Sequence, residues 1–303
     1  MHNYFLNAAA AGMFLRFCNC AARIGELFMS DRSVKEFLRG TGLFQHLQAS
    51  GLRDVYWRIT RSANLEHRAR EVAFYRTLLQ GFKKGDLVFD IGANAGWKTD
   101  IFLRLGATVV AVEPDPTNQE ILRRKFLWCR LRNKPVVIVK KAISNEISTE
   151  AMWVNEAGSA LNTLSPKWKD TLIKQGSYCG ETLTFARKAT VETTTLDELI
   201  RDSGLPFFIK IDIEGYELQA LRGLQRPVPY LSFEVNLPEF KTEGMECIEL
   251  LNRLDSSGQF NLSSASEPAL VLPNWMGKSQ FLRVFAECQT KSIEVFWRRH
   301  THD

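Results

Sequence analysis

A carboxylate and two glycines stand close together in the stretch FDIGANAGWKT, residues 89–99, directly after an apolar run. Gly92 and Gly96 allow tight turns and a close approach of a ligand, because glycine has no Cβ atom. The helix expected directly after them offers free N–H groups in its first turn. The pattern predicts a cofactor-binding loop. Its residues are Asp90, Gly92, Ala93, Asn94 and Gly96.

A second carboxylate, Glu113, lies 21 residues after Gly92 at the end of another apolar run. An acid at this distance can accept hydrogen bonds from both hydroxyls of a ribose. The loop spacing is G-x-x-x-G, not the G-x-G-x-x-G of a dinucleotide site, so the cradle for a pyrophosphate is incomplete. We therefore expect S-adenosylmethionine, with its ribose at Glu113 and its ammonium group near Asp90.

A third acidic stretch, IKIDIEG, contains the candidates for catalysis. Lys210, Asp212 and Glu214 alternate along an expected strand and so share one face. Because a sulfonium methyl group is already activated, an enzyme must align the acceptor and, for an alcohol, remove its proton. Asp212 is the better candidate for this task. Two alternatives stay open: Lys210 pairs with one acid for structural reasons, or Glu214 caps the next helix.

Further polar residues end the next apolar run. Asp212, Glu234 and Asn236 could supply oxygen ligands to Mg²⁺, which would orient a diol and lower its pKa. Polar residues that line a substrate cleft need no metal, so we predict none. The five histidines lie far along the chain from these strand ends, which argues against a histidine base.

The elements that must position these residues alternate along the chain. Short apolar runs rich in Val, Ile and Phe predict strands at 87–92, 107–115, 135–144, 206–215 and 230–236. Helical spacing predicts helical structure over 31–82, ending in the stretch 66–82, and helices at 97–106, 117–133, 195–204 and 216–225. Such alternation predicts a parallel sheet covered by helices on both faces. KSIEVFWRRH, residues 291–300, predicts a final edge strand after a less regular segment.

Several strings resemble the FkbM family of S-adenosylmethionine-dependent methyltransferases over about residues 70–240. They are FDIGANAGWKT, AVEPDPTN, KKAISNE, TTTLDEL and IKIDIEGYELQALRGL. The resemblance implies an α/β fold of the class I methyltransferase type, a Rossmann-like and mostly parallel sheet, usually with an antiparallel last strand. It also implies mostly O-methylation of hydroxyls on sugars or natural products. Glu113 matches the family's ribose acid, and the predicted cofactor site also includes Pro114 and Ala142.

The ends of the chain extend beyond this resemblance. We expect a helical extension at residues 1–70 and the methyltransferase domain at 71–303, with a β-rich insertion at about 145–190 over the acceptor site or as a surface excursion. The apolar stretch 3–29 is interrupted by Arg16 and lacks the basic start of a signal peptide. We expect it to pack on the domain or on a second subunit. Contact with a membrane surface and a cleaved signal are the alternatives.

Composition narrows the functional classes. The net charge of +5 over 303 residues is mild, and its basic residues are scattered among acids, so nucleic-acid binding is not expected. Six dispersed cysteines favour free thiols in a reducing, cytoplasmic setting, with peripheral membrane association as an alternative. We expect a methyltransferase with a small-molecule or glycan acceptor. The formation of homo-oligomers is a further possibility. The alternatives are a scaffold protein that retains the fold and a nicotinamide-dependent oxidoreductase.

Overall fold

The computed structural model describes residues 62–131, 136–178, 181–264 and 267–299. Most of the predicted extension, including the apolar stretch 3–29, lies outside these residues, so the expectation for it stays a prediction. The chain divides into two compact units, Met1–Leu65 and Glu66–Asp303, and the second contains all the side chains discussed below. No helix in the described part of the chain is long and apolar enough to cross a membrane.

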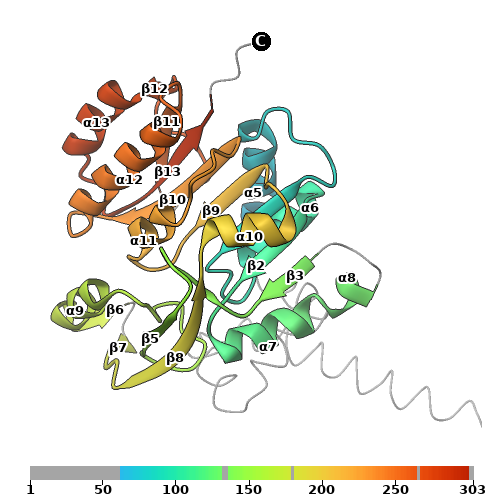
Figure 1. The fold of residues 1–303 in the computed structure, drawn as a ribbon, viewed down its shortest axis with the longest axis vertical. Helices are drawn as coiled ribbons and strands as arrows, with labels where there is room; N and C mark the ends of the chain where they lie inside the picture. The colour runs from blue at the N-terminus through green and yellow to red at the C-terminus, as the bar shows by residue number, and fades with distance from the viewer. Residues whose placement is uncertain (1–61, 132–135, 179–180, 265–266, 300–303) are drawn as a thin grey trace, which may run out of the picture. The chain divides into compact units, whose positions relative to one another are not determined.

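An eight-stranded sheet forms the centre of the second unit, in the order β12-β11-β13-β10-β9-β1-β2-β3 (Figure 1). Its strands are β1 (Leu87–Ile91), β2 (Thr108–Val112), β3 (Val136–Val139), β9 (Phe208–Ile211), β10 (Tyr230–Asn236), β11 (Gln259–Ser264), β12 (Met276–Gly277) and β13 (Ser292–Arg298). The five strands from β3 to β10 are parallel, whereas β13 runs antiparallel to both of its neighbours. From β1 the chain builds β2 and β3 on one side and then returns to β9 on the other. This reversal between β1 and β9 is where ligands bind in open parallel sheets.

Helices cover both faces of this sheet, as predicted (Figure 1). On one face are α5 (Ser62–Leu78), α6 (Trp97–Leu105) and α7 (Pro116–Lys125); on the other are α10 (Leu196–Ser203), α11 (Glu217–Arg222), α12 (Lys241–Leu254) and α13 (Lys278–Glu287). Adjacent strand residues point to opposite faces. Val88 packs in the cluster that contains Phe102 of α6, and Phe89 in the cluster that contains Ile200 of α10. The predicted mixed α/β fold is thus confirmed.

The prediction of a final edge strand is wrong. β13 lies inside the sheet between β10 and β11, and its Val295 and Trp297 are fully buried. The short β12 forms this edge instead. The pattern after residue 240 reads as irregular because β11 buries two polar side chains, Asn261 and Ser263, which interrupt its apolar run.

Two predicted elements are divided in the structure. The helix predicted at 117–133 breaks at the buried Phe126 into α7 and a short α8 (Leu127–Leu131). The strand predicted at 135–144 ends at Val139 in the large sheet, and β4 (Ala142–Ile143) pairs with β8 in a second sheet.

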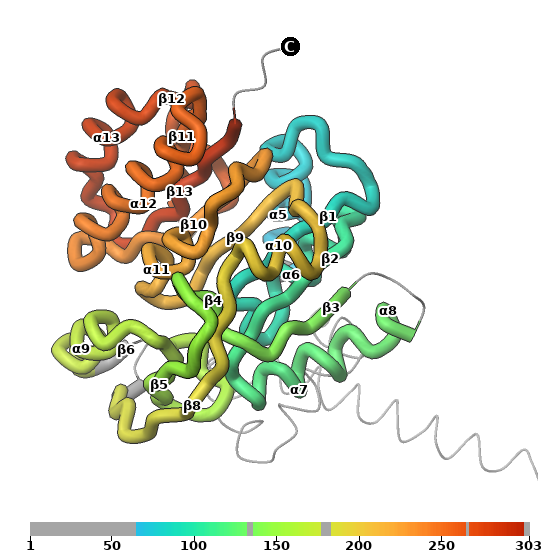
Figure 2. The backbone as a smooth tube through the Cα atoms, viewed as in Figure 1, coloured from blue at the N-terminus to red at the C-terminus, as the bar shows by residue number. Residues whose placement is uncertain are grey.

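The insertion folds as a separate layer next to the carboxyl ends of the strands (Figure 2). It contains β5 (Thr149–Val154), α9 (Pro166–Gln175), the hairpin β6 (Ser177–Tyr178) and β7 (Glu181–Thr182), and β8 (Arg187–Thr194). β5 and β8 pair antiparallel, and β4 completes a three-stranded sheet. Ser165 starts α9 by accepting a hydrogen bond from the Trp168 N–H at 3.1 Å. Trp168 and Leu172 of α9 belong to the main core, so the insertion is anchored there.

Candidate active site

A cavity of about 160 Å³ lies at the carboxyl ends of β1, β2 and β9, at the reversal of strand order. Of the predicted site residues, it is lined by Gly92, Asn94, Glu113, Pro114, Ala142, Asp212 and Glu214. Asp90, Ala93, Gly96 and Lys210 are not part of this lining. The insertion contributes Met152, Ser159, Ala160, Asn162, Thr163 and Leu164. The cavity therefore lies between the glycine loop and the insertion.

The start of the glycine loop is held between two strands. The N–H groups of Gly92 and Ala93 each donate to the Val112 carbonyl of β2 at 3.0 Å. Gly92 has a φ of 83°, and a Cβ atom there would lie 1.8 Å from the backbone oxygen of Asp212. The Asp212 N–H in turn donates to the Ile91 carbonyl at 3.0 Å. Glycine at position 92 thus allows the loop to lie directly against the segment that carries the acids.

The far end of the loop rests on α7. A Cβ atom at Gly96 would lie 2.6 Å from a methyl group of Leu122 and 2.7 Å from the Phe126 ring. Lys125 Nζ donates to the Ala95 carbonyl at 2.9 Å and also to the Gly96 carbonyl. These contacts hold the end of the loop against α7. The side of the loop that does not contact α7 faces the cavity.

Asp90 lies behind the loop. Its carboxylate is buried and accepts a hydrogen bond of 2.5 Å from the Thr99 hydroxyl of α6. Burial raises the pKa of Asp90, whereas Thr99 and the nearby Lys210 act in the opposite direction. The carboxylate thus joins the end of β1 to the first turn of α6, and an interaction with a ligand ammonium stays a prediction.

Glu113 presents an oriented carboxylate to the cavity. Its Oε2 accepts from the Asn94 N–H at 2.7 Å, and its Oε1 accepts from the Asp115 N–H at 2.8 Å. Burial raises the pKa of Glu113 to about 7 despite these two bonds. Beside it, Asn118 Oδ1 is a buried acceptor without a hydrogen-bond partner among the described residues. This side of the cavity fits a ligand that brings hydroxyl and amino donors.

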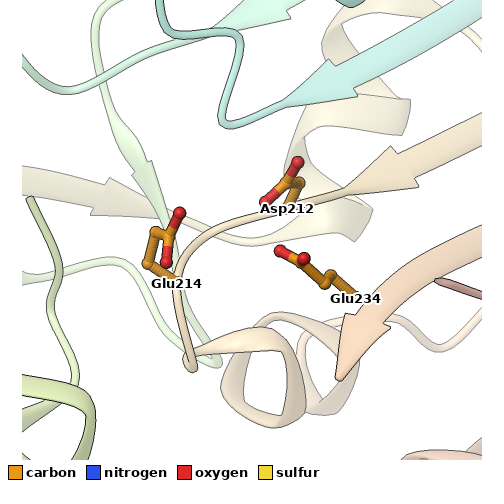
Figure 3. Close-up of side chains that lie close together, drawn as sticks. All are labelled: Asp212, Glu214 and Glu234. Carbon is orange, nitrogen blue, oxygen red and sulfur yellow. The ribbon is translucent and has the colours of Figure 1, made fainter. Parts of the chain in front are cut away.

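On the other side of the cavity, Asp212, Glu214 and Glu234 form a carboxyl cluster (Figure 3). Each offers an oxygen that lies within 4.8 Å of the others. Lys210 Nζ pairs with Asp212 Oδ2 at 2.7 Å, so the ion pair that the sequence left as an alternative is present. Burial works against both charges, yet the mutual attraction outweighs it. The pKa of Asp212 is lowered, and that of Lys210 is raised well above its usual value.

Glu214 is positioned by the insertion. β9 ends at Ile211, so the alternation expected from Lys210 to Glu214 does not extend that far. Glu214 has a φ of 57°, an unusual value for a residue with a side chain. Its carbonyl accepts from the Thr163 hydroxyl at 2.7 Å, and its Oε2 accepts from Trp168 Nε1 at 2.7 Å. Burial, followed by the charge of Asp212, raises the pKa of Glu214 to about 8.

The structure does not show the alternative role of Glu214 as a cap of the next helix. α11 begins at Glu217, and the N-terminal residue Tyr216 makes no side-chain capping bond. Glu217 Oε1 instead accepts from the N–H groups of Ile213 at 3.0 Å and Gly215 at 3.3 Å. Glu214 is therefore left to face the cavity.

Glu234 completes the cluster from β10. Burial, followed by the charges of Asp212 and Glu214, raises its pKa well above the usual range, and its carboxyl group hydrogen-bonds to Asp212. Ser292 Oγ donates to Glu234 Oε1 at 2.5 Å. The cluster thus combines one ionised acid, Asp212, with two carboxyl groups that hold protons readily. The predicted metal ligands were Asp212, Glu234 and Asn236. The two acids of this set lie in the cluster together with Glu214, and the metal role stays an alternative.

Sequence reasoning missed the residues that orient these acids. Trp168 and Thr163 lie 46 and 51 residues before Glu214 in the chain, so spacing gives no sign of the contact. Tyr216 also lines the cavity, and its hydroxyl donates to Glu150 Oε2 at 2.6 Å. Asn118 had the clearest signal, since it follows the expected ribose acid by five residues, in the first turn of the next helix.

Comparisons with known proteins identify a family for the chain. Residues 90–259, more than half of the chain, match the family model described as the methyltransferase FkbM domain. No curated protein matches the chain.

Solved structures give distant similarities. A methyltransferase FkbM from Methylobacillus flagellatus KT is 14% identical with a TM-score of 0.47, over 94% of this chain and 60% of that one. A precorrin-6y C5,15-methyltransferase from Geobacter metallireducens GS-15 is 12% identical with a TM-score of 0.40, over 78% and 87%. An O-methyltransferase from Thermotoga maritima is 10% identical with a TM-score of 0.38, over 77% and 66%. The chain thus spans less than two thirds of the FkbM structure.

The family model begins at Asp90 and includes the glycine loop, Glu113, the insertion and the carboxyl cluster. The residues that build the cavity are therefore those that the match covers. The chain belongs to the FkbM methyltransferase family.

Proposed function

We propose that the chain transfers a methyl group from S-adenosylmethionine to a hydroxyl group of a sugar, a glycan or a natural-product-like small molecule. One observation carries the proposal: a single cavity has the ribose-type acid Glu113 on one side of the glycine loop and the acids Asp212 and Glu214 on the other. A transferase for an alcohol needs both, because the donor must be held and the acceptor must lose a proton.

The residues around Glu113 fit the cofactor. Both oxygens of Glu113 are already oriented by backbone N–H groups, and each keeps a lone pair for a ribose hydroxyl. Asn118 Oδ1 would accept a hydrogen bond from an amino group of the ligand. Gly92 and Asn94 leave the loop backbone accessible at the cavity. When bound, S-adenosylmethionine supplies an activated methyl group.

We assign the acceptor proton to Glu214. A general base works best when its pKa is near the pH of the reaction, and Glu214 has a pKa of about 8. The hydrogen bond from Trp168 Nε1 fixes one oxygen of Glu214, and the second oxygen remains for the acceptor hydroxyl. Asp212 is a weaker base, since Lys210 lowers its pKa. We infer that this ion pair positions the acceptor.

The cellular setting of the protein is also a proposal. We place it in the cytoplasm, supported by the dispersed cysteines, of which Cys129, Cys247 and Cys288 are free in the structure. The methyltransferase domain would then comprise residues 71–303, with a helical extension before it. Nucleic acid is not a proposed partner.

Binding of S-adenosylmethionine is expected to weaken as the pH falls through the pKa of Glu113. The ionised carboxylate accepts the ribose hydroxyls, whereas burial raises its pKa to about 7. Affinity should thus fall about tenfold between about pH 8 and about pH 6. Glu113→Gln should bind about 1.5 to 3 kcal/mol more weakly at the higher pH and lose the pH dependence. Isothermal titration calorimetry measures both.

Glu214→Gln is the control for this experiment, because it changes a second carboxyl of raised pKa in the same cavity and should keep the pH dependence. Tight binding to Glu113→Gln with unchanged pH dependence would contradict the assignment of the cofactor. Binding of NADH instead would favour an oxidoreductase, and binding of neither would favour a scaffold protein. Mass spectrometry of glycans and metabolites from cells with and without the gene would then identify a methylated acceptor.

A further inference from the structure

The short helix α8 exposes an apolar surface. Leu127, Trp128 and Leu131 are 46%, 69% and 65% exposed. They are spaced three and four residues apart, so they lie on one side of the helix. No residue of α8 is buried, although Phe126 directly before it is 2% exposed. The helix is thus anchored at its start, and its apolar side chains point to solvent.

Basic residues flank these apolar side chains. The string RRKFLWCRLRNK, residues 123–134, has six Lys or Arg and no acid. Arg124 is 53% exposed and Arg130 is also exposed, whereas Lys125 is turned toward the glycine loop. The nearest acid in the chain is Glu120, which pairs with Arg124 at 2.8 Å. The exposed apolar side chains of α8 are therefore flanked in the chain by basic residues.

We propose that α8 docks on a membrane surface that contains anionic lipids, with Trp128, Leu127 and Leu131 among the lipid chains and the basic residues at the phosphates. Tryptophan prefers the boundary between water and lipid, and interfacial helices combine Trp and Leu with Lys and Arg. This inference goes beyond methyl transfer and does not depend on it. It also differs from a contact through the N-terminal residues.

The charge of the basic stretch argues against two other occupants. Residues 1–61 contain eight Lys or Arg and four Asp or Glu, so this segment is itself basic and does not complement α8. A second copy of α8 would bring like charges together. A nucleic acid would satisfy the basic residues, but it offers no apolar contact for Leu127 and Leu131. An anionic bilayer satisfies both features.

Docking at α8 has a direct structural connection to the cavity. Phe126, the residue between α7 and α8, packs beneath Gly96, and Lys125 holds the carbonyls of Ala95 and Gly96. A membrane contact would thus be made one residue away from the support of the glycine loop.

The test is co-sedimentation of the full chain with vesicles of phosphatidylcholine, alone or mixed with phosphatidylserine. We expect partitioning onto the mixed vesicles to be about tenfold stronger, since each Lys or Arg near the surface adds attraction, and to weaken with salt. The double variant Trp128→Ser and Leu131→Ser should lower it about tenfold or more, the effect of leaving such side chains in water. Ile147→Ser is the matched control, because Ile147 is 62% exposed on another loop and should bind as wild type.

Each outcome decides the proposal. Thermal melting of both variants first establishes that they are folded, as expected for exposed positions. Equal binding of the double variant and wild type would overturn the role of α8 and assign binding to other residues. Equal binding to both kinds of vesicle would overturn the anionic partner. Loss of dimers, or of RNA binding, in the double variant without any vesicle binding would replace the membrane by a second copy or by nucleic acid.

Discussion

Glu214→Gln is expected to lower kcat by about 100-fold or more, the range for losing a positioned general base. The substitution keeps the shape of the side chain and its place beside Trp168, so the fold should be retained. It also leaves the Lys210 and Asp212 ion pair intact. The affinity for S-adenosylmethionine should change less than about threefold, because Glu113 lies on the other side of the loop. Steady-state kinetics and calorimetry on the same preparation give both quantities.

The pH profile of wild type adds a second measurement. A base must be ionised to accept a proton, and the pKa of Glu214 is about 8. The rate should therefore rise with pH up to about this value and then level, and Glu214→Gln should abolish the rise. Trp168→Phe removes a hydrogen bond to the carboxylate form of Glu214, so it should move the midpoint of the rise to higher pH.

Asp212→Asn tests whether the base is Glu214, as proposed, or Asp212, which the sequence favoured. It leaves the buried Lys210 without its partner, so its activity loss should come with a lower melting temperature. Full activity in Glu214→Gln, with a large loss in a stable Asp212→Asn, would make Asp212 the base. A wild-type rate that a chelator abolishes and Mg²⁺ restores would favour the metal alternative for the cluster.

Local patterns in the sequence were sufficient to predict that the glycine loop and Glu113 lie together. The glycine loop and Glu113 depend on residues that lie within about one strand-helix-strand unit, where strand ends and spacing define positions. The structure accordingly places Gly92, Asn94 and Glu113 at one cavity. The parallel order of the first strands followed from the same alternation.

The proposed acceptor side of the cavity depends on contacts between distant segments, which spacing does not reveal. Glu214 faces the cavity because a residue in the insertion, Trp168, bonds its side chain. Its left-handed backbone also ends the alternation from which its direction was predicted. In the same way, β13 is an interior strand because β11 pairs beside it. The sequence did not predict β11, because the buried polar residues Asn261 and Ser263 interrupt its apolar run.

Gly92→Ala is expected to have the largest effect on stability, about 4 kcal/mol or more. The new Cβ atom would lie 1.8 Å from the Asp212 carbonyl oxygen, and that atom is backbone, so no side-chain rotation relieves the contact. Either the loop or the segment after β9 must move. Because these two parts carry the proposed cofactor and acceptor sides of the cavity, any folded Gly92→Ala protein should lose both cofactor affinity and turnover.

Gly85→Ala is a matched control for the backbone strain alone. Gly85 also has a positive φ, 98°, but nothing lies within 4 Å of the position of its Cβ atom. Its substitution should cost only about 1 to 2 kcal/mol, the cost of a left-handed backbone for a residue with a side chain. Urea denaturation of both variants gives the difference between them, which isolates the contact between the loop and Asp212. Equal losses of stability would mean that strain, and not this contact, requires glycine at position 92, and the close packing of the two halves of the site would then be wrong.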